Sequence, residues 1–381
     1  MSARPETPAA GAQSAPPSLP GQDGPLRAVF MGSPDFAAII LRRLLDSPLL
    51  DICGVCTQPD RPAGRGRKNS PPPVKIVALD RSLPLLQAEH FKADAEGDAA
   101  FVRLADWTPD LLIVAAYGLI LPRRVLDLPR MLPLNVHASL LPRHRGAAPI
   151  QRALLAGDFV TGISIMRMVS ELDAGPILLQ RAVGIDIAET YQTLHDELAG
   201  EGAELLLLAI ERLRAGKAVL IDQDAGRATY APKITRLDCP LDFSQPAAVL
   251  HAHIRALYPK PGATMLLHRP GREDLQLSAA PGIYPLPEDL ATFVKNTRIR
   301  LHGGVWDEDW DGFGDREWNK LAGRVLGLEK GVLLVACADG AYAFSSLRPA
   351  GKKSMDAGAF ANGYLGGCAL SGKDGVFFSA G

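Results

Sequence analysis

Short apolar segments alternate with segments of helical periodicity along the first half of the chain. The apolar segments lie at residues 26–31, 51–57, 84–87, 110–116 and 134–137. The fourth is apolar almost throughout, as expected for a strand whose two faces are both covered by helices. This alternation predicts an α/β fold with a Rossmann-like, doubly wound, mostly parallel sheet.

The second half of the chain has a different pattern. After a long amphipathic stretch at residues 189–213, the periodicity weakens over residues 216–230, which we interpret as a linker. Beyond it, short β-rich segments separated by Gly and Pro predict a small, OB-like β-barrel over residues 231–381. We expect residues 26–215 to form the first domain and residues 1–25, rich in Pro, Ala and Gly, to be a disordered extension.

Composition and charge exclude several classes of protein. A chain of 381 residues, 47% hydrophobic and 22% charged, suits about two globular domains. No run approaches the roughly 20 apolar residues of a membrane helix, so we expect no membrane partner. The net charge of −1 requires any nucleic acid to meet a local basic patch. Five scattered cysteines argue against a disulfide framework, favour the cytoplasm, and complete no zinc site.

Two polar side chains lie on the segment expected to form the fifth strand. Asn135 and His137 are two residues apart and therefore share one face, whereas Val136 points to the opposite face and into a core. Side chains at the carboxyl ends of parallel strands line the crevice where ligands bind. This stretch alone is compatible with a ligand site and equally with a turn-capping Asn135 beside a partly buried His137.

A long loop is expected at residues 58–71. It is rich in Gly and Pro and carries four cations within eight residues, namely Arg61, Arg65, Arg67 and Lys68. Loops of this length without structure of their own are usually functional or disordered. Composition leaves open both an arm that contacts phosphates and a solvated flexible loop.

Asp173, in a polar turn after the apolar segment at residues 161–168, adds a third group to Asn135 and His137. An amide N–H stabilises an oxyanion, a histidine acts as general acid or base, and a carboxylate orients the histidine. Ser139 is near, but no G-x-S-x-G elbow surrounds it. We therefore expect an acyl-transfer site whose nucleophile belongs to a substrate.

These motifs resemble those of the 10-formyltetrahydrofolate-dependent formyltransferases, over about residues 26–270 and again near residues 347–353. NVHASLLP at residues 135–142, together with LDAG at residues 172–175, is similar to the signature of the whole group. TQPDRPAGRGRK at residues 57–68 resembles the basic loop of the branch that acts on initiator methionyl-tRNA. RHRGAAPIQ, which begins at Arg143, also looks like this branch.

The resemblance implies a reaction and a role for each group. The α-amine of methionine on charged initiator tRNA attacks the formyl group of 10-formyltetrahydrofolate, and no metal takes part. Asn135 and protonated His137 are the catalytic groups that stabilise the oxyanion, and catalytic Asp173 holds His137. The folate co-substrate is expected to lie along two loops, formed by Tyr117, Gly118, Leu119, Ile120, Ser139, Leu140, Leu141 and Pro142.

The resemblance also implies how the tRNA is bound by what we expect to be a monomer. The basic loop enters the inside of the acceptor stem, with Arg65 as its main contact, and the barrel binds the outer face through phosphates. The expected tRNA contacts are Arg61, Arg65, Arg67, Lys68, Arg143 and Arg145.

The carboxyl-terminal part departs from the family pattern. From residue 224 onward the chain has 18 Lys and Arg against 17 Asp and Glu, and the Trp-rich segment 305–318 holds one of the cations and six of the acids. We expect this acidic insertion to face away from the tRNA, because it would otherwise weaken phosphate binding.

Two alternative functions remain open at this point. A formyltransferase acting on an amino-sugar nucleotide or on glycinamide ribonucleotide would keep Asn135, His137 and Asp173, but it needs neither the basic loop nor a second domain. A non-catalytic RNA-binding protein on a degenerate scaffold is disfavoured, because all three polar groups are present.

Overall fold

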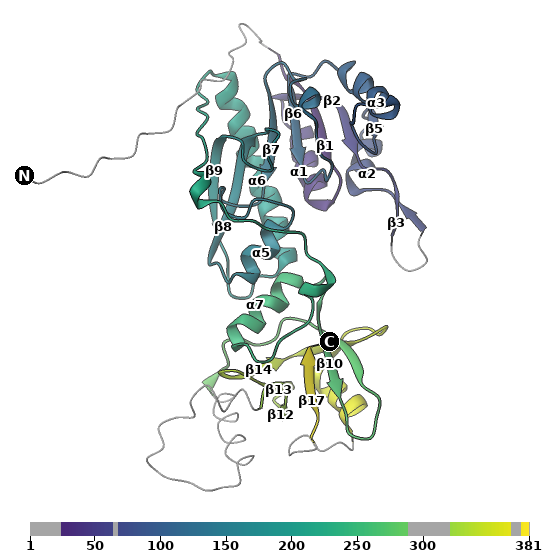
Figure 1. Ribbon diagram of the computed structural model, residues 1–381, viewed down its shortest axis with the longest axis vertical. Helices are drawn as coiled ribbons and strands as arrows, with labels where there is room; N and C mark the ends of the chain where they lie inside the picture. Colours follow the sequence, from purple (N-terminus) through teal and green to yellow (C-terminus); the bar gives the residue numbers. More distant parts are fainter. Residues whose placement is uncertain (1–23, 64–67, 289–320, 367–374, 381) are drawn as a thin grey trace, which may run out of the picture. The chain divides into compact units, whose positions relative to one another are not determined.

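The computed structural model describes residues 24–63, 68–288, 321–366 and 375–380 (Figure 1). The acidic insertion and nearly all of the expected extension lie outside these residues. The chain forms two compact units. The first comprises the residues up to Pro149, Val160–Gly184 and His195–Lys233, and the second comprises Ile150–Phe159, Ile185–Leu194 and the chain from Ile234 onward.

A seven-stranded sheet in the order β5-β2-β1-β6-β7-β8-β9 organises the first unit. Its parallel strands are β1 (Leu26–Gly32), β2 (Leu50–Thr57), β5 (Leu85–Gln87), β6 (Leu111–Ala115) and β7 (Leu132–His137). The antiparallel strands at one edge are β8 (Val160–Arg167) and β9 (Ile177–Gly184). The predicted Rossmann-like, mostly parallel sheet is therefore confirmed.

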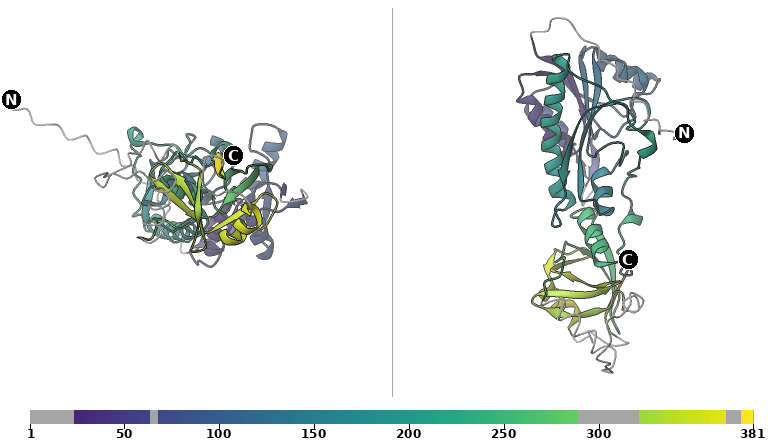
Figure 2. Two further views of the ribbon diagram at one scale, coloured as in Figure 1. Left: turned by 90° about the horizontal axis from the view of Figure 1, so that it is seen from below. Right: turned by 90° about the vertical axis from the view of Figure 1, so that its left-hand side faces the viewer.

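Helices cover both faces of this sheet, as Figure 2 shows for the long α6. They are α1 (Asp35–Leu45), α2 (Pro73–Asp80), α3 (Ala95–Ala105), α4 (Arg123–Leu126) and α6 (Tyr191–Arg214). The short α5 (Pro149–Leu155) belongs to the second unit except for its first residue. Gly202 of α6 approaches the sheet so closely that a Cβ there would lie 2.9 Å from Cγ1 of Val136. On the opposite face, Val114 of β6 shares a buried core with Leu104 of α3 and Leu126 of α4. The face opposite Val136 is the one that carries Asn135, because side chains alternate along β7.

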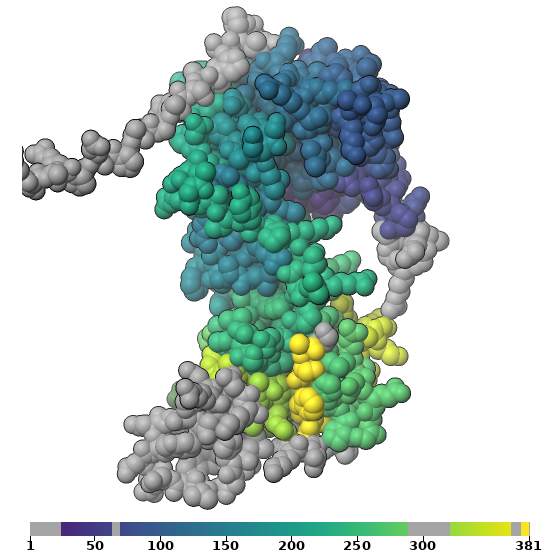
Figure 3. Space-filling view, viewed as in Figure 1, coloured from purple at the N-terminus to yellow at the C-terminus, as the bar shows by residue number. Residues whose placement is uncertain are grey.

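A short hairpin stands within the loop that the sequence left without structure. Its strands β3 (Arg61–Ala63) and β4 (Lys68–Ser70) pair antiparallel, with Arg61 opposite Ser70. The Nζ atom of Lys75 lies 2.8 Å from both carboxylate oxygens of Asp60, which anchors the entry to the hairpin. Figure 3 shows the hairpin, in purple-blue, projecting from the first unit.

Two antiparallel sheets form the second unit, in the orders β16-β15-β11-β10-β17 and β12-β13-β14. Their strands are β10 (Ala263–His268), β11 (Leu275–Ala279), β12 (Val325–Glu329), β13 (Val332–Cys337), β14 (Gly340–Phe344), β15 (Ser346–Pro349), β16 (Met355–Asp356) and β17 (Phe377–Ala380). Both sheets, α7 (Ala247–Leu257) and α10 (Ala357–Phe360) contribute to one buried core. The expected small, antiparallel β-domain at the carboxyl end of the chain is confirmed, with its strands divided between two sheets.

The second unit contains a buried histidine whose two ring nitrogens are both paired. The Nε2 atom of His251 donates to the carbonyl oxygen of Ile187 at 2.8 Å, and its Nδ1 atom lies 2.9 Å from Oη of Tyr342. A carbonyl only accepts, so the proton of the neutral ring is on Nε2. Burial lowers the pKa of His251 below its ordinary value.

We expect the second unit to lose stability as the pH falls below about 6.5. The unfolded chain binds a proton at His251 more readily than the folded chain, because burial lowers the pKa of this residue. The contribution of neutral His251 to the stability of the folded state is therefore complete above the pKa of the unfolded chain. It is lost as the pH falls toward the lower pKa of the folded chain. The melting temperature of the wild type at pH 5.5 should lie several degrees below that at pH 7.5. His251→Gln should show a smaller difference, and an equal difference in both proteins would contradict this assignment.

Candidate active site

Asn135 and His137 are buried at the carboxyl end of β7, with exposed fractions of 8% and 6%. Asn135 lies beside Val114 of the parallel neighbour β6, and His137 lies opposite Ser164 of the antiparallel neighbour β8. Pro133, two residues before Asn135, shares their face of the strand. Strand alternation, read from the sequence alone, had predicted this pairing of an amide and an imidazole.

The imidazole of His137 is fixed by one contact at each nitrogen. Its Nε2 atom lies 2.9 Å from the carbonyl oxygen of His144, and because a carbonyl only accepts, Nε2 carries a proton. Its Nδ1 atom lies 3.8 Å from Oδ2 of Asp173. That separation is within ion-pair range but longer than a direct hydrogen bond. The structure thus brings together the three polar groups that the sequence singled out.

Asp173 reaches His137 from a tight turn. Its backbone is in the left-handed region, with φ of 48°, which residues with a Cβ disfavour. The backbone N–H of Gly146 donates to Oδ2 of Asp173 at 2.8 Å. Gly175, two residues on, leaves no room for a side chain, since a Cβ there would lie 1.8 Å from the carbonyl oxygen of Arg167. The carboxylate is therefore held by both the turn and the loop after β7.

The loop after β7, one of the two expected to line the folate, is fixed by buried hydroxyl groups. Ser139 is fully buried, and its Oγ atom donates to the carbonyl oxygen of Arg143 at 2.7 Å. The Oγ atom of Ser164 donates to the carbonyl oxygen of Ser139 at 2.6 Å and accepts from the N–H of Leu141 at 3.1 Å. Leu140 and Pro142 are half-buried.

The loop after β6, the other expected folate loop, is more open. Tyr117 is buried, and its carbonyl oxygen accepts from Nε2 of Gln58 at 2.9 Å. Gly118 has φ of 78° and lies against the same glutamine side chain. Leu119 is half-buried, whereas Ile120 is 92% exposed. This exposed apolar side chain is available to a ligand.

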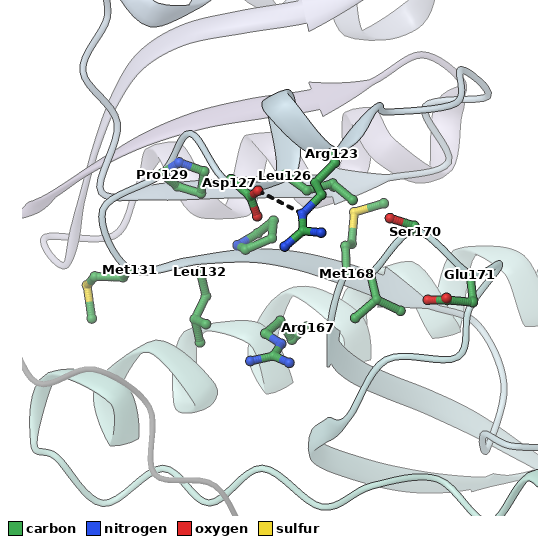
Figure 4. Close-up of a pocket in the computed structure, with 12 residues that line it drawn as sticks. Arg123, Leu126, Asp127, Pro129, Met131, Leu132, Arg167, Met168, Ser170 and Glu171 are labelled. Atoms are coloured by element: carbon green, nitrogen blue, oxygen red, sulfur yellow. Dashed lines mark hydrogen bonds and ion pairs between the residues drawn. The ribbon is translucent and has the colours of Figure 1, made fainter.

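A cavity of about 550 Å³ lies between the chain at residues 123–133 and the chain at residues 167–171. Arg123, which is bonded to Asp127, lines one side, and Arg167 and Met168 line another (Figure 4). Leu132 and Pro133, at the start of β7, also line it, and Pro133 lies on the strand face that carries Asn135 and His137. Its volume suits a small-molecule ligand. Sequence reasoning did not identify these residues, although residues 167–171 end only two positions before Asp173.

The expected tRNA contacts differ in their surroundings. Arg61 is exposed and lies 3.5 Å from Glu89, and Arg143 is exposed. Arg65 and Arg67 lie outside the described residues, as does the side chain of Lys68. Arg145 is only 6% exposed, and its guanidinium donates to Gln223 rather than facing solvent.

Among the described residues, no group of three or more His, Cys, Asp and Glu side chains is placed to hold a metal ion. No helix in the described part of the chain has the length and apolar content needed to cross a membrane.

Comparison with known proteins shows to which family the chain belongs. Residues 26–210 match the formyl transferase family, and residues 233–365 match the formyl transferase C-terminal domain. A methionyl-tRNA formyltransferase of Nitratidesulfovibrio vulgaris (strain DP4) is 45% identical over 348 residues, covering 91% of this chain and 96% of that protein. A methionyl-tRNA formyltransferase of Desulfovibrio desulfuricans is 41% identical over 347 residues, covering 90% and 94%.

Among solved structures, HypX from Aquifex aeolicus in complex with tetrahydrofolic acid aligns with a TM-score of 0.53 and 16% identity, covering 90% of this chain and 48% of that one. At that identity the likeness concerns the fold. The parallel sheet, the polar cluster at the end of β7 and the second antiparallel domain together define a formyl transferase. The chain belongs to the methionyl-tRNA formyltransferase family.

Proposed function

We propose that this chain transfers the formyl group of 10-formyltetrahydrofolate to the α-amino group of methionine carried by initiator tRNA. The observation that carries the proposal is the site itself. His137 lies between Asp173 and the loop after β7, with Asn135 on the same strand face. This arrangement can polarise a carbonyl and move a proton, and the tRNA-borne amine supplies the nucleophile. Similarity to the relatives along nearly the whole chain supports this acceptor.

In the proposed reaction the amine nitrogen attacks the formyl carbon and the oxygen becomes an oxyanion. The amide N–H of Asn135 and the imidazole of His137 stabilise that charge. The bond between the formyl carbon and N10 then breaks, the amine loses a proton and N10 gains one. His137 and Asp173 form the titratable pair positioned to carry this proton.

The folate is proposed to occupy the cavity beside β7 and to extend along the loops at residues 117–121 and 139–142. Pro133 belongs both to the cavity and to the strand face of the polar pair, so a ligand that extends from the cavity along this face approaches Asn135. The formyl group is then the part of the folate that reaches His137. No metal is needed for this chemistry.

The tRNA is proposed to bind through the β3–β4 hairpin and the second unit. Asp60 is held by Lys75 and Gln87, and these hydrogen bonds lower the pKa of its carboxyl group. Hydrogen bonds from Lys75 and Gln87 therefore hold the base of the hairpin, and the proposed contacts with the acceptor stem come from the cations of this loop. Residues 1–25 and the acidic insertion have no assigned part in this binding.

We expect the apparent KM for charged tRNA to rise steeply with salt, because each phosphate contact releases counterions. The plot of log KM against log salt concentration should be linear, with a slope that reports the number of phosphates neutralised. The KM for 10-formyltetrahydrofolate, measured in the same series, serves as the control and should change far less. A flat response for the tRNA would argue against a polyanionic acceptor.

The proposed activity is tested by incubating the purified chain with 10-formyltetrahydrofolate and charged initiator tRNA. Deacylation of the tRNA should release N-formylmethionine, detected by mass spectrometry. Uncharged tRNA and charged elongator tRNA are the controls. Release of methionine alone from the initiator tRNA would exclude the proposed function.

We further propose that the enzyme acts as a monomer in the cytoplasm. One chain supplies every group named in the reaction. The four described cysteines are free thiols, which suits a reducing compartment.

A further inference from the structure

The segment that follows α6 contacts both loops of the site. We call residues 220–231 the strap. Its Ile221 exchanges two backbone hydrogen bonds with Ile177, at 2.8 and 2.9 Å, just beyond the turn that carries Asp173. The backbone N–H of Arg145, in the loop after β7, donates to the carbonyl oxygen of Thr229 at 2.8 Å. The strap therefore belongs to the architecture of the site.

One side chain of the strap connects these two loops directly. The Oε1 atom of Gln223 accepts from Nε and Nη2 of Arg145 at 3.0 and 2.7 Å. Its Nε2 atom donates to the carbonyl oxygens of Asp173 and Gly175 at 2.8 and 2.7 Å. An amide accepts two hydrogen bonds and donates two, so the capacity of Gln223 is filled. Because arginine only donates and carbonyls only accept, the orientation of the amide is also fixed.

The hydrogen bonds from Gln223 stabilise the part of the Asp173 turn that has an unfavourable backbone conformation. Asp173 has φ of 48°, a conformation that its Cβ disfavours. The side-chain amide of Gln223 donates to the backbone carbonyl oxygens of Asp173 and Gly175. The Asp173 carboxylate, 3.8 Å from His137, is carried by the same backbone, so relaxation of the turn would displace it from the imidazole.

We infer that Gln223 is a positioning residue for formyl transfer, which keeps the Asp173 carboxylate beside His137 with Arg145 as its buried support. The inference rests on the role proposed above for Asp173. Arg145, which the sequence suggested as a tRNA contact, has the different task of orienting the Gln223 amide. Residues that orient a primary catalytic group commonly change turnover strongly without touching the substrate.

Two substitutions test the inference. Gln223→Met has similar volume and removes all four hydrogen bonds. Gln223→Glu keeps the interaction with Arg145 but sets carboxylate oxygens against the two carbonyl oxygens. Both should lower kcat about 10- to 100-fold, with the KM values for folate and charged tRNA within about threefold of wild type. Gln245→Met removes a glutamine bonded to Asp242 in the second unit and should leave kcat within twofold.

A double-mutant cycle separates this role from a general structural one. In an Asp173→Asn background, Gln223→Glu should lower kcat by less than about threefold, since its effect passes through the carboxylate already lost. An equal loss in both backgrounds would overturn the inference, as would wild-type kcat in a folded Gln223→Glu variant. If Gln223→Met does not fold, the Gln223→Glu result decides alone. An inactive wild type would instead count against the proposed function.

Discussion

Replacing His137 by Ala should lower kcat for formyl transfer by about three orders of magnitude. The imidazole is the only titratable group at the carboxyl end of β7 among the described residues of that strand, and Asn135 alone cannot move a proton. Asp173→Asn should cause a loss of similar order, because the amide cannot balance an imidazolium at 3.8 Å. Single-turnover formylation of charged initiator tRNA measures both effects.

Binding of tRNA to these two variants should match wild type within about twofold, since neither group belongs to the hairpin. His90 offers a matched control in the same unit. Its Nδ1 atom also lies 3.8 Å from a carboxylate, that of Asp94, but at the surface. His90→Ala should keep kcat within twofold. Wild-type turnover in the His137 or Asp173 variant would remove the chemical basis of the assignment.

Arg65→Ala should raise the KM for charged initiator tRNA about 10- to 100-fold while leaving kcat for bound tRNA close to wild type. A charge-assisted hydrogen bond to a phosphate or base is worth about 1.5–3 kcal/mol, which corresponds to that range. The KM for 10-formyltetrahydrofolate should not change. Steady-state kinetics with each substrate varied in turn separates these parameters.

Arg42→Ala provides the control for loss of one positive charge. Arg42 lies in the last turn of α1 and is exposed, and no contact with tRNA is assigned to it. Its KM for tRNA should rise less than twofold. If both substitutions raised the KM for tRNA equally, the hairpin would contribute only general positive charge. If Arg65→Ala left this KM unchanged, Arg65 would not contact the tRNA.

The sheet and the central polar pair were predictable because each leaves a local signal. β6 is buried at every position and therefore reads as a continuous apolar run. Asn135 and His137 interrupt a similar run at spacing two, which places both on one face. Residues covered by helices on both sides tolerate few polar groups, so such an interruption indicates a site.

The parts that were not predicted depend on contacts between distant segments. Arg167 and Met168 line the cavity because β8 runs antiparallel beside β7, and only the register places them near Pro133. Gln223 lies in a segment without periodicity, and its partners are far away in the sequence. Arg145 was expected to contact tRNA, but its backbone pairs with the strap and its side chain is buried.

The β3–β4 hairpin was missed for a different reason. Its strands have three residues each and include Pro62, so they show neither alternation nor β-propensity. The hairpin forms because Arg61 pairs with Ser70 above the base held by Lys75 and Asp60. Composition identified the chemistry of this loop but not its conformation.

A competition between acceptors in one reaction tests directly whether the formyl group is transferred to initiator tRNA. Charged initiator tRNA, glycinamide ribonucleotide and an amino-sugar nucleotide are offered together with limiting 10-formyltetrahydrofolate, and the formyl group is located by mass spectrometry. Nearly all of the formyl group should appear as N-formylmethionine on the tRNA. Formylation of either small amine in preference to the tRNA would contradict the proposed acceptor.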